Sequence, residues 1–326
     1  MLDVQLSTWA ATIGGLVVVL GFDQWIARRK GEHAFSVGEA TRWVGFYVAL
    51  AVAFGVGLWV VGGHQAGAEF LAGYLTEYSL SVDNLFVFVI IMSSFAVPAA
   101  SQHKVLLFGI ALALVLRGAF IAIGAAAIER FVWVFFVFGA FLVYTAVKLA
   151  TSQEQHGDEQ RENKAAKLLG RLLPTTDAYD GAKVFTRLAG KRVVTPMLLV
   201  MVAIGSTDLL FALDSIPAIF GLTKEPYIVF TANAFALMGL RQLYFLLDGL
   251  LDRLVYLSKG LAVILGFIGV KLALHAFHEY GAAWAPDIGI APSLAVIIGT
   301  LVVTTVLSLR TTRKDPTAVR STPTAG

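Results

Sequence analysis

The chain of 326 residues contains no cysteine and few charged side chains. Without a thiol it can form no disulfide, no thiolate metal site and no cysteine nucleophile. Charged residues make up 14% of the sequence, whereas a typical soluble protein carries about 25%. Hydrophobic residues make up 57%, which excludes a disordered chain and an ordinary soluble domain. This composition predicts an all-α, polytopic membrane protein.

Nine apolar stretches are long enough to cross a bilayer as helices, which takes about 20 residues each. They cover residues 5–27, 41–62, 68–95, 104–127, 130–150, 196–221, 227–248, 255–277 and 288–309. Most of the 25 Lys and Arg residues would face the cytoplasm if the N-terminus lies outside. The positive-inside rule therefore predicts a multi-pass protein with its N-terminus outside and its C-terminus cytoplasmic. Basic residues placed in this way, with a net charge of only +3, argue against nucleic acid as a partner.

An internal repeat relates residues 68–150 to residues 196–277. Each stretch carries two acids six residues apart, then an arginine, then a short run that ends in Lys-Leu. The matched residues are Glu77, Asp83 and Arg117 in the first stretch and Asp208, Asp214 and Arg241 in the second. Because each stretch holds three spans, consecutive copies must enter the membrane from opposite sides. The pattern predicts an inverted 3+3 helix repeat, an architecture found in secondary transporters.

The remaining segments complete the predicted organisation. Residues 1–67 are expected to form two peripheral helices, and residues 278–309 a final peripheral helix. Residues 151–195 are polar and predict a cytoplasmic loop, with a short helix around 160–172. Residues 310–326 are rich in Thr and Pro, which predicts a disordered cytoplasmic tail.

The four acids of the repeat would lie near the middle of the membrane. There a single aspartate costs about 2.5–3.5 kcal/mol on insertion scales, so a functional role must be considered for each. The two arginines can neutralise only two of the four carboxylates. The excess of negative charge disfavours an anion and favours a divalent cation, and oxygen ligands suit Mg, Ca and Mn. Arg117 and Arg241 are expected to be gating or ion-pair partners, although purely structural ion pairs would also explain the acids.

Helix geometry suggests how the acids would be arranged. Residues six apart on one helix are separated by about 9 Å along its axis, so one unbroken helix cannot bring both acids to one ion. An inverted repeat predicts two layers instead, Glu77 with Asp214 and Asp83 with Asp208. Pro217 and the polar residues around Glu77 predict that both helices are broken here, exposing backbone carbonyls to a cation.

Other polar residues have simpler interpretations. Lys148 and Lys271 are expected to extend from their helices towards the membrane surface. His275, His278 and Glu279 predict a solvated helix end, with weak metal binding as the alternative. The sequence contains no phosphate-binding Gly-x-x-x-x-Gly-Lys-Ser/Thr motif and no Ser-His-Asp arrangement within the spans. We therefore expect that the protein is not an enzyme.

Two long segments resemble signatures of the TerC family of tellurium-resistance membrane proteins, and within it the Alx-like branch. The first is Glu77-Tyr78-Ser79-Leu80-Ser81-Val82-Asp83-Asn84-Leu85-Phe86-Val87-Phe88. The second is Ser206-Thr207-Asp208-Leu209-Leu210-Phe211-Ala212-Leu213-Asp214-Ser215-Ile216-Pro217-Ala218-Ile219-Phe220. The resemblance spans about residues 40–310 and implies a bacterial inner-membrane protein related to the LysE-type transporters. Carried over by motif position, the implied metal-pathway residues are Glu77, Asp83, Asn84, Asp208, Asp214 and Ser215.

The resemblance also suggests a function. Alx-like members are associated with manganese export, and other members with supplying metal to secreted proteins. The preferred hypothesis is a secondary exporter of Mn²⁺, with proton exchange as a candidate driving force and no tightly bound cofactor. The alternative is a membrane scaffold or metal-supply partner that acts on other membrane or secreted proteins through residues 151–195. A channel remains open as a third hypothesis. An acid-lined pathway repels oxyanions, so we expect any effect on tellurite to be indirect.

Overall fold

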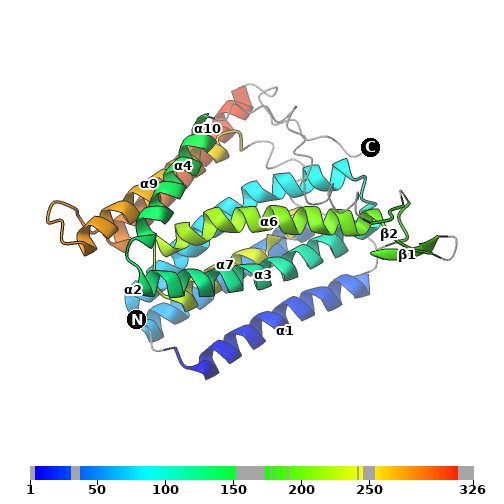
Figure 1. Cartoon of the computed structure of the whole chain (residues 1–326), viewed down its shortest axis with the longest axis horizontal. Helices are drawn as coiled ribbons and strands as arrows, with labels where there is room; N and C mark the ends of the chain where they lie inside the picture. The colour runs from blue at the N-terminus through cyan, green and yellow to red at the C-terminus, as the bar shows by residue number, and fades with distance from the viewer. Residues whose placement is uncertain are drawn as a thin grey trace.

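The protein is a bundle of helices with one short β-hairpin (Figure 1). The computed structural model describes residues 4–30, 37–151, 173–176, 178–181, 183–188, 191–240, 242–244 and 254–314. Its helices are α1 (Leu6–Lys30), α2 (Val37–Ser94), α3 (Ala99–Arg130), α4 (Val134–Thr151), α6 (Pro196–Phe220), α7 (Pro226–Met238), α9 (Leu257–Glu279) and α10 (Ile290–Lys314). Among the described residues, 6 helices are long and apolar enough to cross a membrane. The fold is therefore that of an all-α polytopic membrane protein, while nine spans and the inverted repeat stay predictions.

Helix α2 covers both the second and the third predicted spans. Gly63 lies between them with φ 89° and ψ 165°, a non-helical conformation that glycine adopts without steric cost. The two halves then pack against each other, because Gly67 lies against Trp59 and Gly55 lies against Leu71. The chain thus turns back at Gly63, and α2 consists of two adjacent antiparallel helices.

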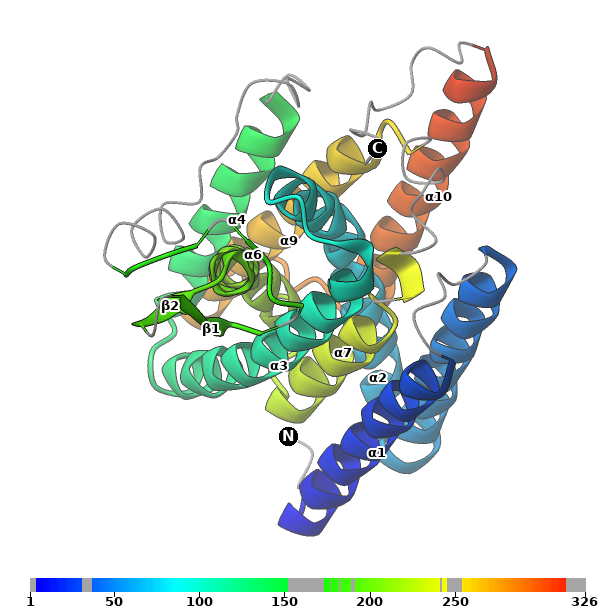
Figure 2. The same cartoon turned by 90° about the vertical axis from the view of Figure 1, so that its right-hand side faces the viewer.

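The helices pack in two groups (Figures 1 and 2). In the first group, α2 packs against α7 and α3 packs against α6. In the second group, α4 packs against α9 and α10 packs on α9. Helix α6 also contacts α4 and so connects the two groups, as the end-on view of α6 in Figure 2 shows. Helix α1 has few contacts with the other helices.

The segment predicted as a loop contains a β-hairpin. Strands β1 (Phe185–Leu188) and β2 (Lys191–Val194) pair in antiparallel register and lead directly into α6. The partly exposed Asp180 accepts hydrogen bonds from Lys183 and Thr186, which hold its pKa below the usual range. The hairpin was not predicted, because the segment was assigned as a loop from its polar composition. The β-branched residues of the segment, which favour strands, were not considered. The predicted helix at 160–172 lies outside the described residues.

The final helix is longer than predicted. Helix α10 extends to Lys314, so residues 310–314, which were assigned to the disordered tail, are helical. Threonine and basic residues are compatible with a last helical turn that leaves the membrane, which the compositional argument did not consider. Residues 315–326 lie outside the described part of the chain.

The crossing of α4 and α9 depends on two glycines. A Cβ atom on Gly139 would lie 2.7 Å from the carbonyl oxygen of Gly269, and a Cβ on Gly269 would lie 2.8 Å from the carbonyl oxygen of Gly139. Both distances are too short for carbon against oxygen, so the two backbones touch only because side chains are absent. Small residues allow such close approach of helices in membranes.

We expect Gly139→Ala to lower the melting temperature of the detergent-solubilised protein by several degrees, because it forces α4 and α9 apart. Gly57→Ala is the matched control, since a Cβ at Gly57 meets nothing within 4 Å. The control should leave the melting temperature unchanged or raise it, because alanine favours the helix by about 1 kcal/mol. Equal melting temperatures for both variants would contradict the close crossing.

Candidate functional site

Arg117 on α3 joins four helices at the centre of the first helix group. Its guanidinium forms ion pairs with Glu77 on α2 and with Asp208 on α6, the latter at 3.3 Å between Nη2 and Oδ1. Nη1 also donates hydrogen bonds to Ser215 Oγ at 3.2 Å and to Asn233 Oδ1 at 2.6 Å. We call these five residues the Arg117 cluster. It connects segments that lie between 40 and 116 residues from Arg117 in the sequence.

The whole cluster is withdrawn from solvent, and none of its five residues is more than 4% exposed. Burying a charge is costly unless it is paired and hydrogen-bonded. One guanidinium faces two carboxylates, so with both acids ionised the cluster keeps a net charge of −1. The partners of Arg117 come from different helices, so moving one helix away would leave an uncompensated buried charge. The ion pairs therefore favour the packed arrangement of these helices.

The pairing of the acids differs from the predicted layers. Glu77 shares Arg117 with Asp208, and it does not lie with Asp214. At 3.6 residues per turn, Ser215 lies seven residues after Asp208 on nearly the same face of α6, whereas Asp214 is rotated by about 120° from Asp208. Asp214 instead accepts a hydrogen bond from Thr145 on α4 at 3.1 Å. The predicted Glu77–Asp214 layer is therefore wrong.

The helices are also not broken beside the acids. Helix α6 is continuous through Pro217, and Gly63 is the non-helical residue within α2. Pro217 lies in the last turn of α6 and has no N–H, so the carbonyl oxygen of Leu213 loses its usual helical donor. Ser79 donates a hydrogen bond to the carbonyl oxygen of Leu75 at 2.7 Å, so its hydroxyl supports the helix. The helices are therefore continuous at the acids, and the Leu213 carbonyl is the one that a proline deprives of its donor.

Two buried oxygen atoms beside Arg117 lack a hydrogen-bond partner within the described part of the chain. They are Glu77 Oε2 and Thr76 Oγ1. The other oxygen of Glu77 receives a hydrogen bond from Ser81 at 3.1 Å as well as from Arg117. An unsatisfied carboxylate oxygen in an apolar environment is unfavourable, and a proton, a water molecule or a cation would satisfy it.

The other predicted site residues have different outcomes. Asn84 is half-buried on α2. The side chain of Asp83 and all of Arg241 lie outside the described structure. Among the residues that are described, no group of three or more His, Asp or Glu side chains is arranged to hold a metal ion. The assignment of a metal pathway to the predicted residues thus remains a prediction.

Three functional candidates were missed from the sequence. Asn233 belongs to the Arg117 cluster, and an asparagine in the middle of an apolar span was a usable signal. Glu69 is 8% exposed on α2 and was overlooked because it lies at the start of a predicted span. Lys271 is also 8% exposed and donates a hydrogen bond to Ser293, so the prediction that it reaches the membrane surface is wrong. Its partner lies on α10, which sequence spacing does not reveal.

The helical bundle and its buried ionic cluster define an integral membrane protein with charged groups inside the membrane. Residues 62–316 match the family described as "Integral membrane protein TerC family", and the chain belongs to that family. This result confirms the resemblance of the two signature segments, while it leaves the LysE-type relationship untested.

Several relatives extend over nearly the whole chain. A membrane protein of Mycobacterium tuberculosis (strain H37Rv) is 47% identical over 319 residues, which cover 94% of this chain and 79% of the relative. A membrane protein of Myxococcus xanthus is 41% identical over 97% of this chain and 96% of its own length. The Escherichia coli K12 protein named "Putative membrane-bound redox modulator Alx" is 39% identical over 92% and 93%, respectively. No solved structure matches the chain.

We expect Arg117→Met to destabilise the protein by about 3–5 kcal/mol, because it leaves two buried carboxylates without their cation. The measurement is thermal unfolding in detergent, with Arg130→Met at the exposed end of the same helix as the matched control. Adding Glu77→Gln to Arg117→Met should restore part of the lost stability, because one uncompensated charge disappears. An unchanged melting temperature for Arg117→Met would show that the cluster does not hold the helices together.

Proposed function

We propose that the protein is a secondary transporter that exports divalent cations, most favourably Mn²⁺, through the carboxylates at the centre of the bundle. The charge balance carries the proposal. Glu77 and Asp208 share the one guanidinium of Arg117, so one negative charge remains between them. Asp214 adds a third carboxylate on another face of α6, where Thr145 donates to it and Lys148 is its electrostatic neighbour. A divalent cation would supply the positive charge that Glu77 and Asp208 lack. An anion, including an oxyanion, has no such partner here.

Arg117 has a specific role in this mechanism. Its guanidinium lies between Glu77 and Asp208, the position that a cation bound to both carboxylates would take. When a divalent cation binds these carboxylates, like charges repel the guanidinium, which keeps the neutral acceptors Ser215 and Asn233. Glu77 Oε2, which is buried without a hydrogen bond from the described residues, is the oxygen that such a cation would contact first. Binding of the cation would also release any proton held by these acids, which favours proton exchange as the driving force.

The architecture proposed from the sequence supports a carrier. The first helix of each proposed repeat packs against the second helix of the other, α2 with α7 and α3 with α6, and the two third helices, α4 and α9, pack together. Such reciprocal packing is expected of inverted repeats, in which substrates are bound at the repeat interface near the midplane. The distribution of Lys and Arg supports an orientation with the N-terminus outside.

Oxygen ligands support the choice of metal. Carboxylate, hydroxyl and amide oxygens surround Arg117, and the described residues place no histidine in the cluster. Such donors suit Mn²⁺, Ca²⁺ and Mg²⁺ alike, and the choice of Mn²⁺ among the three follows the resemblance to Alx-like proteins. The relationship to LysE-type transporters, which rests on resemblance alone, is compatible with export.

The competing proposal is a membrane scaffold or metal-supply partner that acts through residues 151–195. Its support is that Glu77 and Asp208 are already paired with Arg117, as structural acids would be. The Alx relatives are named as putative redox modulators, which suggests redox activity as a further hypothesis. The 326 residues of this chain contain no cysteine thiol that could carry out thiol–disulfide exchange. The scaffold proposal predicts that deletion within 151–195 abolishes function, and that neutralising the acids acts through protein abundance.

The decisive variant is Asp214→Asn, because Asp214 lies outside the Arg117 cluster and its neutralisation leaves that network intact. Purified protein in proteoliposomes should transport Mn²⁺, and Asp214→Asn should reduce the initial rate at least tenfold while its melting temperature stays near that of the wild type. Asp180→Asn, at a partly exposed position beside the hairpin, is the matched control and should transport normally.

Cells under manganese stress provide the second readout. The wild type should lower cellular manganese, whereas Asp214→Asn at equal protein abundance should not. If Asp214→Asn transports Mn²⁺ like the wild type, Asp214 is not part of the pathway. If the wild type itself transports no divalent cation, the transporter proposal fails and the scaffold proposal takes its place.

A further inference from the structure

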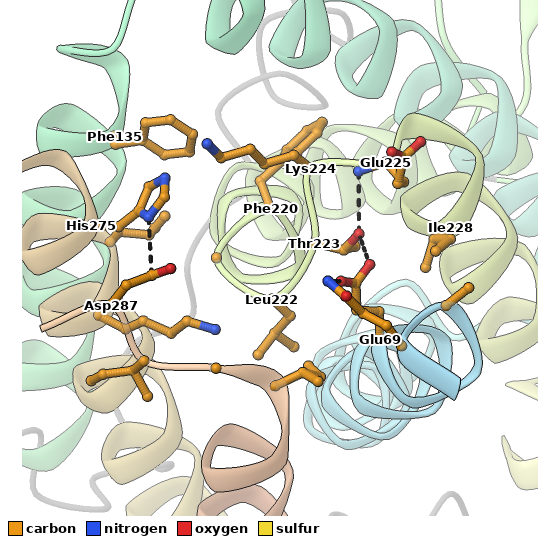
Figure 3. Close-up of a pocket in the computed structure, with 18 of the residues that line it drawn as sticks. Glu69, Phe135, Phe220, Leu222, Thr223, Lys224, Glu225, Ile228, His275 and Asp287 are labelled. Atoms are coloured by element: carbon orange, nitrogen blue, oxygen red, sulfur yellow. Dashed lines mark hydrogen bonds and ion pairs between the residues drawn. The ribbon is translucent and has the colours of Figure 1, made fainter. Parts of the chain in front are cut away.

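A cavity of about 490 Å³ lies at the end of the bundle opposite the β-hairpin. It is lined by α2 next to Gly63, by Phe135 on α4, by the connection between α6 and α7, by α9 and by the connection between α9 and α10. Figure 3 shows Glu69 on one side of this cavity and His275 and Asp287 on the opposite side. The sequence did not indicate a cavity here, because its lining comes from five separate parts of the chain.

The cavity contains buried charges of both signs that do not touch. Glu69 accepts hydrogen bonds from Gln65 Nε2 at 2.8 Å and from Thr223 Oγ1 at 2.5 Å. The ammonium of Lys271 donates to Ser293 Oγ at 3.1 Å, and it interacts with Glu69 and Asp287 only electrostatically among the described residues. A buried carboxylate and a buried ammonium that face one cavity without contact leave the carboxylate accessible to another cation.

The lining charges nearer the surface are already engaged. Asp287 Oδ1 lies 3.2 Å from His275 Nδ1, and Lys224 Nζ forms an ion pair with Glu279 at 3.3 Å. Lys224 also lies 5.1 Å from the centre of the Phe135 ring. Glu69 is therefore the deepest carboxylate of the cavity, and the outer ion pairs form its rim.

Polar residues of the cavity and residues of the Arg117 cluster are separated by the same number of residues on three segments of the chain. Glu69 precedes Glu77 by eight residues on α2, and Thr223 follows Ser215 by eight residues on α6 and its connection. Glu225, at the start of α7, precedes Asn233 by the same number. Eight residues of helix correspond to about 12 Å, so polar groups lie at two levels of one helix interface.

An apolar layer separates the two levels. Ile219 on α6 and Ala232 on α7 are completely buried between them. Gly73 on α2 packs against both, since a Cβ at Gly73 would lie 3.2 Å from Ile219 and 3.3 Å from Ala232. The layer leaves no room for a hydrated ion, so the cavity and the Arg117 cluster are disconnected in this conformation.

We propose that this cavity is the mouth of the cation pathway, that Glu69 receives a hydrated divalent cation there, and that the layer of Gly73, Ile219 and Ala232 closes the pathway towards the Arg117 cluster. The inference rests on the proposed function and deepens it. It adds an entry or exit site and a gate to the central carboxylates.

The size and the donors of the cavity fit a hydrated ion. Six water molecules occupy about 180 Å³ at about 30 Å³ each, which a cavity of about 490 Å³ accommodates. A hydrated cation needs no close cage of ligands, consistent with the absence of a three-residue metal cluster among the described residues. Lys271 opposes such a cation by charge repulsion and so weakens its binding, which favours passage over retention.

Two substitutions with opposite effects test the site. In proteoliposomes, Glu69→Gln should raise the KM for Mn²⁺ several-fold, because the receiving carboxylate is lost. Lys271→Met should lower the KM, because a repelling charge is removed from the same cavity. Glu129→Gln, at an exposed position of α3, is the matched control for loss of an acid and should leave the KM unchanged.

The gate requires its own variant. Ile219→Ala should increase the passive leak of Mn²⁺ down a gradient, because it opens the apolar layer. Ile204→Ala is the matched control, since Ile204 is equally buried on the same helix but lies on the other side of the Arg117 cluster. Melting temperatures of all five variants identify any change that is due to misfolding.

The outcomes separate this inference from the proposed function. If the wild type transports Mn²⁺ but Glu69→Gln and Lys271→Met change the KM in the same direction or not at all, the cavity is not the mouth of the pathway, and the central carboxylates remain. If Ile219→Ala leaks no more than Ile204→Ala, the apolar layer is not the gate. If the wild type transports no divalent cation, both proposals fail together.

Discussion

The arrangement of the central helices depends on the buried guanidinium of Arg117. A charge in this environment is tolerable only with partners, and its partners come from α2, α6 and α7. Because the partners are far apart in the sequence, their shared contact fixes how the two halves of the chain meet. The apolar surfaces of these helices are less specific, since Leu, Ile, Val and Ala pack in many relative rotations. The ionic cluster therefore selects one register of the bundle.

Composition and hydropathy were sufficient to predict the helical class, because a run of about 20 apolar residues is typical of a membrane-spanning helix. The central acids were predictable for a related reason, since an unnecessary charge in the membrane is costly. The pairing of these acids was not predictable while the helices were assumed to be broken. In a continuous helix, Ser215 lies seven residues after Asp208 and therefore on nearly the same face. Asp214 lies six residues after Asp208 and therefore on a different face. The burial of Lys271 depends on Ser293 of another helix, and no local pattern contains that information.

The ion pairs with Arg117 are compatible with a structural role, but they do not account for all the acids. A network that serves only stability is best when its charges are matched, and replacing such groups with apolar residues is often neutral or stabilising. Here two carboxylates share one guanidinium, Glu77 keeps a buried oxygen without a hydrogen bond from the described residues, and Asp214 lies one face away on α6. The excess charge reduces stability, and the proposed transport of a cation would explain why it is retained.

The position of the cavity adds a second constraint. Polar residues that serve packing alone have no reason to recur at the same eight-residue distance on three adjacent segments, with an apolar layer between the two levels. The proposed pathway would need two polar levels with an apolar layer between them. Polar groups would bind the ion at each level, and the apolar layer would be the barrier between the two binding positions. The barrier consists of small and branched side chains at Gly73, Ile219 and Ala232, and slight relative motion of α2, α6 and α7 would change its width. The same helices hold Arg117, so displacing the guanidinium and opening the layer involve the same contacts.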